Sequence, residues 1–98
     1  MSRELIIRPE AEAEIAEAFV WYEARSSGLG SEFLLVLDAA FNSILRNPNL
    51  YPQVHKRVRR ALTRKFPFAV FFLVEKKRIV VLSVFHAKRN PQVWRKRT

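Results

Sequence analysis

The sequence predicts a single α+β domain in which a curved antiparallel sheet, or a mixed one, carries an N-terminal helical hairpin on one face. Apolar residues recur with a period near four up to residue 46, and with a period near two or in continuous runs after residue 57. The length of 98 residues fills one hydrophobic core. Residues 1–98 are therefore expected to form one domain with the order β-α-α-β-β-β.

The N-terminal segment changes from strand to helix at a proline. Residues 4–8 are short and apolar in their middle, which favours a strand. Pro9 ends a strand but suits the first turn of a helix. Glu10 and Glu12 supply the negative charge that a helix N-terminus favours.

A first helix follows, up to the region of Arg25 and Gly28. Its apolar residues recur at helical spacing: Ile15, Ala18, Phe19 and Tyr22. Its glutamates are interpreted as a solvated face: Glu10, Glu12, Glu14 and Glu17.

A second helix is expected from Ser31, which can cap its N-terminus, to the stop at Asn47 and Pro48. One stripe of this helix is apolar: Phe33, Leu37, Phe41 and Ile44. The linker between the two helices is short, so they are expected to form a hairpin.

Strands are predicted over residues 58–65, 68–74 and 79–85. The last two are continuous apolar runs, which is typical of central strands covered on both faces. The first strand must cross the helices to join the sheet, beside one of these late strands. The predicted core comprises Ile15, Phe19, Leu37, Phe41, Val70, Phe72, Val81 and Leu82.

Charge is divided unevenly along the chain. Residues 1–49 have four basic and eight acidic side chains, whereas residues 50–98 have fourteen basic side chains and Glu75 as their one acid. Such a field attracts phosphate backbones or an acidic protein, and its self-repulsion opposes the compact state when no partner is bound.

Composition excludes several kinds of site. The chain has no cysteine, which excludes disulfides, a thiolate zinc site and a cysteine nucleophile, and makes the cytoplasm the expected compartment. The residues show neither a set of metal ligands nor a glycine-rich phosphate loop, so no metal and no cofactor is expected. No signal peptide is recognisable, and the apolar runs are shorter than the roughly 18 residues of a membrane helix, so we expect no membrane partner.

One small group of residues has the chemistry to act on a phosphodiester. Adjacent antiparallel strands can bring Arg60 and Arg64 near the end of the last strand, where His86 emerges. Arginines bind phosphate, and a histidine exchanges a proton near neutral pH. Two simpler interpretations stay open: a solvated sheet face for the arginines, and a strand-end histidine bonded to the backbone for His86.

Further side chains on or next to the late strands are candidate binding residues: Arg57, Arg59, Lys65, Lys88, Trp94 and Arg95. Trp94 lies in a basic tail, where it either stacks on a base or clamps the tail to the body of the domain. The clamp is the interpretation we favour.

Several short segments occur in a distinctive order: Trp21-Tyr22-Glu23, Gly28-Leu29-Gly30 followed by Glu32-Phe33-Leu34, Asn47-Pro48 with Tyr51-Pro52, Arg64-Lys65-Phe66-Pro67-Phe68, and His86-Ala87-Lys88-Arg89-Asn90-Pro91. Their order and spacing, together with the predicted elements, resemble the RelE/ParE superfamily of toxins. The resemblance spans nearly the whole chain.

This resemblance implies the toxin of a type II toxin-antitoxin, or plasmid stabilisation, system, whose cognate antitoxin wraps and neutralises it. A largely acidic antitoxin matches the basic second half of the chain. By position, Arg60 and Arg64 resemble the arginines of the second-strand region of the family, and His86 and Arg89 resemble a His-x-x-Arg-x-Pro ending found in many ParE-like sequences.

The family contains two activities. RelE-like members cleave messenger RNA on the ribosome without a metal, often with a C-terminal tyrosine or histidine, whereas ParE-like members block DNA gyrase. Tyr22 and Tyr51 both precede the late strands, and Glu75 is the one late acid, so a C-terminal tyrosine and a carboxylate base are lacking. The sequence therefore favours a gyrase inhibitor.

Two alternatives stay open. In the first, the chain is a metal-independent, ribosome-dependent endoribonuclease, with His86, Arg60, Arg64 and Arg89 as its catalytic residues. In the second, it is a plain nucleic-acid-binding module.

Overall fold

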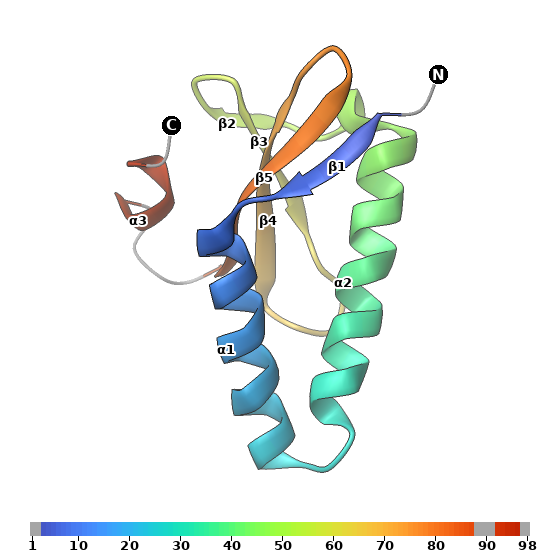
Figure 1. The fold of residues 1–98 in the computed structure, drawn as a ribbon, viewed down its shortest axis with the longest axis vertical. Coiled ribbons are helices and arrows are strands. Elements are labelled where there is room, and N and C mark those ends of the chain that lie inside the picture. Colours follow the sequence, from blue (N-terminus) through green and yellow to red (C-terminus); the bar gives the residue numbers. More distant parts are fainter. Residues whose placement is uncertain (1–2, 88–91, 97–98) are drawn as a thin grey trace.

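The computed structural model describes residues 3–87 and 92–96. Its elements follow one another as β1 (Glu4–Ile7), α1 (Pro9–Arg25), α2 (Leu29–Arg46), the 3-10 helix η1 (Pro48–Leu50), β2 (Gln53–His55), β3 (Val58–Leu62), β4 (Phe68–Val74), β5 (Arg78–His86) and α3 (Gln92–Arg95) (Figure 1). The helical hairpin and the strands that follow it confirm the predicted α+β fold.

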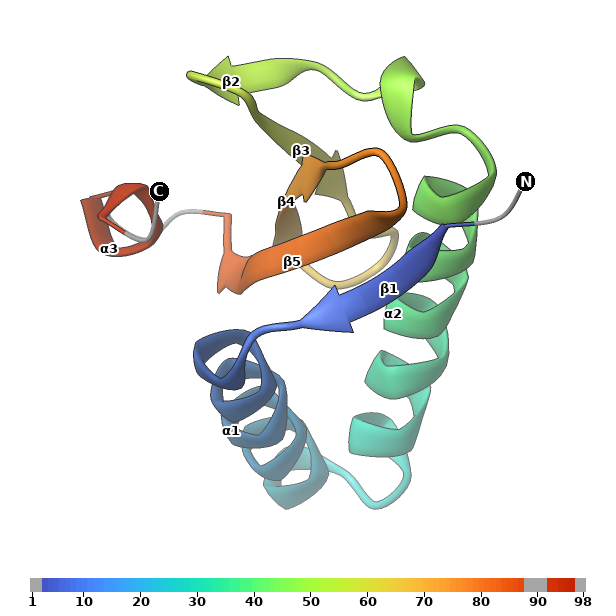
Figure 2. The same ribbon diagram turned by 45° about the horizontal axis from the view of Figure 1, so that its top comes forward.

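The strands form one mixed sheet in the order β1-β5-β4-β3-β2. β1 runs parallel to β5, with Glu4 opposite Arg78 and Ile7 opposite Val81. All other neighbouring strands are antiparallel. The first strand therefore joins the sheet beside the last one, as Figure 2 shows for β1 (blue) and β5 (orange).

α1 and α2 pack side by side against the sheet, and the loop that joins them points away from it (Figure 1). We call the side of the sheet that meets these helices the helix face, and the opposite side the outer face. The helix-face core contains buried residues from both helices and the strands, including Phe33, Leu37, Phe41, Ile44, Val70, Phe72, Ile79, Val81 and Val84.

The outer face has a buried cluster of its own: Val58, Ala69, Phe71, Val80, Leu82 and Phe85. β4 and β5 are thus buried on both faces, as their continuous apolar runs predict.

The predicted core residues of α2 and the strands are buried, but those of α1 are less so. Ile15 packs partly buried against the helix-face core. Phe19 lies outside this core and lines an outer groove with Val20 and Leu34. The prediction that Phe19 is a core residue is wrong, because the apolar stripe of α1 is wider than the sector that the sheet covers.

The second helix begins earlier than expected. α2 starts at Leu29, and its N-cap is Gly28, with a left-handed φ of 88°. Ser31 lies inside the helix, so the prediction that it caps the N-terminus is wrong. A carboxylate from α1 takes over this capping, as described below.

The strand expected over residues 58–65 ends at Leu62, because the chain turns before β4 and Lys65 adopts a φ of 71°. The preceding loop contains the unexpected strand β2, which pairs with β3 through a turn where Lys56 has a φ of 52°.

Candidate functional site

An extra residue in β5 changes the direction of its C-terminal end. The register between β4 and β5 shifts at Phe71/Phe72, since Phe72 lies opposite Val81 whereas Phe71 lies opposite Ser83. Leu82 is the additional residue of this β-bulge.

The bulge reverses the alternation of faces along β5. Val81 and Val84 both belong to the helix-face core, although an odd number of positions separates them. His86, two residues beyond Val84, therefore faces the helices as well.

His86 lies half-buried at the end of β5, opposite Phe68 in β4. Its imidazole packs edge-on against the Phe68 ring, with the ring centroids 5.5 Å apart and the planes at 69°. A small cavity of about 60 Å³ has both side chains in its wall, together with Glu14 and Glu17 of α1. The immediate surroundings of His86 are thus aromatic and acidic.

Glu14 ties α1 to the bulged part of β5. Its Oε1 accepts hydrogen bonds from the hydroxyl of Ser83, at 2.9 Å, and from the backbone N–H of Val84, at 3.1 Å. Ser83 is fully buried, so this carboxylate satisfies a hydroxyl that water does not reach. The interpretation of Glu14 as part of a solvated face is wrong.

Two of the three predicted catalytic arginines, Arg60 and Arg64, do not line this cavity. Arg60 stands opposite Phe71, a residue of the outer-face cluster, and cross-strand neighbours share a face. Arg60 is therefore exposed on the outer face. Arg64 follows the end of β3 and lines a groove against α2. His86, Arg60 and Arg64 accordingly lie in different surroundings.

Two of the predicted binding residues make contacts within the fold. Arg59 donates from Nη1 to the carbonyl oxygens of Tyr51, at 2.5 Å, and Asn49, at 3.4 Å. Lys65 forms an ion pair with Glu32 of α2. These contacts hold η1 and the β3–β4 connection in place.

The other predicted binding residues belong to the β2–β3 turn and to the chain after β5. Arg57 is exposed in the β2–β3 turn and lines a pocket of about 250 Å³ with Leu73 and Glu75. Arg95 is partly buried in α3. Lys88 lies outside the described residues, as does Arg89, the third predicted catalytic arginine. The side chain of Trp94 also lies outside them, so its clamp stays a prediction.

A groove of about 380 Å³ runs between α2 and β3. Small side chains of α2 form one wall: Ala39, Ala40 and Ser43. The other wall comprises residues at the end of β3 and beyond it: Ala61, Leu62, Thr63 and Arg64. Tyr51 also lines the groove.

Glu23 caps the N-terminus of α2 from the preceding helix. Its Oε2 and Oε1 accept the N–H groups of Gly28 and Gly30, both at 2.9 Å. These hydrogen bonds lower the pKa of the Glu23 carboxyl, and the one from Gly28 has the largest effect. A further bond from the backbone of Ser31 also lowers this pKa.

The two helices also come close together at Gly30. A Cβ on Gly30 would lie 2.8 Å from the carbonyl oxygen of Phe19. The two helices thus approach too closely there for a side chain.

The outer side of the hairpin exposes apolar side chains. Val20 is 64% exposed, Leu35 71% and Trp21 52%. The Trp21 ring packs edge-on against Tyr22 and carries the guanidinium of Arg25 at 4.2 Å from its centroid. Burial raises the pKa of the Tyr22 hydroxyl, which lies in the aromatic core. Trp21 thus lies at the exposed edge of the helix and Tyr22 in the core.

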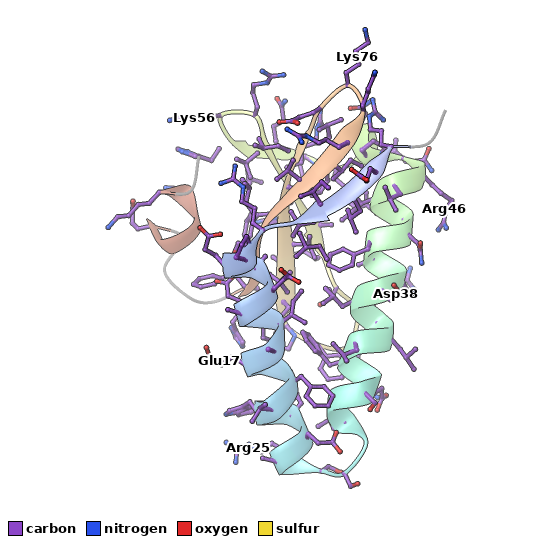
Figure 3. All side chains as sticks on the ribbon, in the orientation of Figure 1. Glu17, Arg25, Asp38, Arg46, Lys56 and Lys76 are labelled. Atoms are coloured by element: carbon purple, nitrogen blue, oxygen red, sulfur yellow. The ribbon has the colours of Figure 1, made fainter. Side chains whose placement is uncertain are left out.

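Basic side chains lie toward both ends of the molecule. Figure 3 shows Lys56 and Lys76 toward the end away from the hairpin loop and Arg25 toward the other. Glu75 pairs with Arg78 at 2.6 Å, and this hydrogen bond raises the pKa of Arg78. The β4–β5 turn thus combines this ion pair with the exposed Lys76.

Residues 3–87 and 92–96 offer neither a cluster of metal ligands nor a membrane-spanning helix. No group of three or more His, Cys, Asp or Glu side chains there is placed to hold a metal ion. None of the helices in the same residues is both long and apolar enough to cross a membrane.

Comparisons with known proteins identify related folds. Residues 5–91 match the family described as ParE toxin of type II toxin-antitoxin system, parDE. Among solved structures, the chain is similar to one from the chromosomal ParDE TA system of P. aeruginosa, with a TM-score of 0.78, 17% identity, and 88% of this chain and 97% of that one covered. No curated protein matches the chain.

Proposed function

Because the chain belongs to the ParE toxin family of type II toxin-antitoxin systems, we propose that it arrests growth by binding DNA gyrase in the cytoplasm. A cognate, largely acidic antitoxin neutralises it. The excess of basic over acidic side chains after residue 49 supports an acidic antitoxin, since opposite charge speeds association and offsets self-repulsion.

The position of His86 and Arg60 on opposite faces of the sheet supports the choice of target. A metal-free ribonuclease must remove the proton of the ribose 2′-hydroxyl and stabilise the charge of the phosphorane at the same nucleotide. Arginine can do the second task but is too basic for the first. His86 suits the first task, yet it faces Glu14 and Glu17, whereas Arg60 lies on the outer face. This arrangement supports protein binding over RNA cleavage.

Exposed apolar side chains also support a protein target. Leu62 is 60% exposed and lies two positions from both Arg60 and Arg64. Leu50 is 80% exposed, between two residues whose carbonyl oxygens accept hydrogen bonds from Arg59. Apolar residues next to arginines are typical of surfaces that bind proteins, whereas nucleic-acid surfaces are more uniformly polar.

The proposal is tested by expressing the chain without antitoxin and measuring two quantities. One is DNA supercoiling by purified gyrase in the presence of the chain, and the other is primer extension on messenger RNA from the arrested cells. We expect supercoiling to be lost while the messages stay intact, both in the original chain and in His86→Ala. His55→Ala, which removes the other histidine, is the matched control.

Three outcomes contradict the proposal in different ways. Codon-positioned cuts that disappear in His86→Ala, with supercoiling unchanged, would assign the chain to the ribonucleases. Tight, salt-sensitive binding to naked DNA or RNA without growth arrest would indicate a nucleic-acid-binding module. If supercoiling is not lost and the messages are not cleaved, the chain has no toxin activity.

A further inference from the structure

Two turns of the sheet enclose a pocket of about 250 Å³. One is the β2–β3 turn, which contributes Lys56 and Arg57, and the other is the β4–β5 turn, which contributes Glu75. Both turns lie at the end of the molecule away from the hairpin loop (Figure 1). The pocket thus joins two segments that are separate in the sequence.

The side chains that these two turns expose are charged. Six exposed residues form the turns: Lys56, Arg57, Glu75, Lys76, Lys77 and Arg78. Beneath them Val58 is buried, and Leu73 and Val74 are partly buried, so apolar side chains form the floor of the pocket. Apolar walls strengthen and focus the field of the charges around a cleft. This surface therefore differs from the one around Leu62, where an apolar side chain is itself exposed.

The one acid of the two turns is already paired. The Oε1 of Glu75 accepts a hydrogen bond from the Nε of Arg78 at 2.6 Å, and the carbonyl of Glu75 accepts one from the Nε of Arg3 at 2.9 Å. Four positive charges remain without an ion-pair partner among residues 3–87 and 92–96: Lys56, Arg57, Lys76 and Lys77. The turns therefore present a net positive surface to an anionic ligand.

The β2–β3 turn holds a lysine where a glycine would fit more easily. His55 pairs with Val58, so Lys56 and Arg57 are the two residues of a tight hairpin turn. Lys56 has a left-handed φ of 52°. Turns of this length favour glycine, asparagine or aspartate at such a position, because a Cβ is strained there. Strain of this kind is concentrated at ligand-binding sites, which indicates a use for the Lys56 side chain.

The lining of the pocket favours a duplex over a single strand. Proteins that bind single-stranded nucleic acids stack the bases on aromatic rings. The described residues that line this pocket include no aromatic ring. Lysine and arginine bind the phosphates of a duplex without reading its bases. A run of duplex phosphates is therefore the ligand whose chemistry fits.

We propose that these two turns bind the phosphate backbone of duplex DNA. Lys56 and Arg57 hold phosphates from the β2–β3 turn, and Lys76 and Lys77 hold them from the β4–β5 turn. Gyrase acts on duplex DNA, so a chain bound to gyrase meets this ligand there. That role of the site rests on the proposed function. A second contact of this kind raises the overall affinity, because the DNA is held close to the bound chain.

The test measures the binding of a short, fluorescent DNA duplex to the chain alone, by anisotropy at several salt concentrations. We expect a dissociation constant of about 10⁻⁵ M at physiological salt. The logarithm of the affinity should fall with the logarithm of the salt concentration with a slope of about −3 to −4, because each neutralised phosphate contributes about −0.9.

Lys56→Gly separates a binding role from a structural one. It should weaken duplex binding by about fivefold and make the salt slope shallower by about 0.9. The variant should unfold at the same temperature or a higher one, since glycine adopts a φ of 52° without strain. A purely structural Lys56 would give the opposite pair of results, with lower stability and an unchanged slope.

Two further variants locate the DNA. Lys76→Gln combined with Lys77→Gln should make the slope shallower by about 1.8. Arg25→Gln is the matched control, because it removes an exposed positive charge at the opposite end of the molecule (Figure 3). It should change the slope by less than about 0.3.

The inference is overturned if the duplex does not bind at roughly millimolar concentration, or if Arg25→Gln changes the slope as much as Lys56→Gly. Tighter binding of a single strand or of an RNA duplex would also overturn it. Gyrase is absent from this assay, so the result is independent of the proposed target.

The role on gyrase is tested separately with purified gyrase. Lys56→Gly should lower the affinity of the chain for the gyrase–DNA complex by about fivefold, and its affinity for DNA-free gyrase by less than about twofold. Equal affinity of the variant and the original chain for the complex would overturn this role. Duplex binding by the turns without any binding to gyrase would support the site and contradict the proposed function.

Discussion

The carboxylate of Glu14 in α1 bonds to both the Ser83 hydroxyl and the Val84 amide at the bulge of β5. Ser83 and Val84 follow Glu14 in the sequence by 69 and 70 positions, so this contact anchors the first helix to the last strand. It also lies beside His86, so the same carboxylate that supports the bulge shapes the surroundings of the histidine.

Glu14→Ala should lower the free energy of unfolding by about 1–3 kcal/mol, because it leaves a buried hydroxyl and a backbone N–H without their acceptor. Glu14→Gln keeps an acceptor oxygen and should lose less. Chemical denaturation measures both, and Glu17→Ala, an exposed position on the same helix, is the control. Equal losses for Glu14→Ala and Glu17→Ala would contradict the role of this contact.

Gly30→Ala should destabilise the hairpin by about 1–3 kcal/mol, since the new methyl group would meet the backbone of Phe19, which cannot rotate away. Ser31→Ala, at the next position, should stay within about 0.5 kcal/mol, because its hydroxyl does not cap the helix. Thermal or urea unfolding of the two variants provides the comparison. The reverse ranking would restore Ser31 as the cap.

Glu23 should make stability depend on pH in the acidic range. Its folded pKa is lowered below the ordinary value of 4.5, so its contribution is fully present above that value and is lost as pH falls through the folded pKa. The gap in urea midpoint between the original chain and Glu23→Gln should therefore be largest near neutral pH and shrink below about pH 4. Glu12→Gln corrects for the change in net charge, and a gap that grows on acidification would refute the prediction.

Arg59→Ala should loosen η1 and β2, because it removes the donor that holds the carbonyl of Tyr51. We expect a loss of about 1.5–3 kcal/mol, typical of hydrogen bonds to charged groups. Faster amide exchange in residues 48–55 would locate the effect. Arg60→Ala, its exposed neighbour, should leave both quantities nearly unchanged, and a matching loss there would indicate a general effect of charge.

Periodicity predicted the elements whose apolar pattern is long. α2 and the runs that became β4 and β5 each present several buried positions at the spacing of their structure. β2 escaped prediction because three residues carry little pattern, and this strand depends on pairing with β3 and on the positive φ of Lys56. The start of α2 was misplaced because its capping group, Glu23, lies on the preceding helix.

The candidate site shows a different limit. The sequence placed His86 at the end of the last strand, where it lies. Which face it occupies depends on the single extra residue at Leu82, and alternation alone gives no sign of such a bulge. Glu14 could have been found, because it lies one turn before the buried Ala18 and one turn after the buried Ala11.

The parallel pairing of β1 with β5 also governs when the fold can form during synthesis. Glu4 is translated 74 residues before its partner Arg78. At about 5–20 residues per second, the first strand waits several seconds for its neighbour. A nascent chain therefore cannot complete its sheet, and an antitoxin already present in the cell has this interval in which to meet an unfinished toxin.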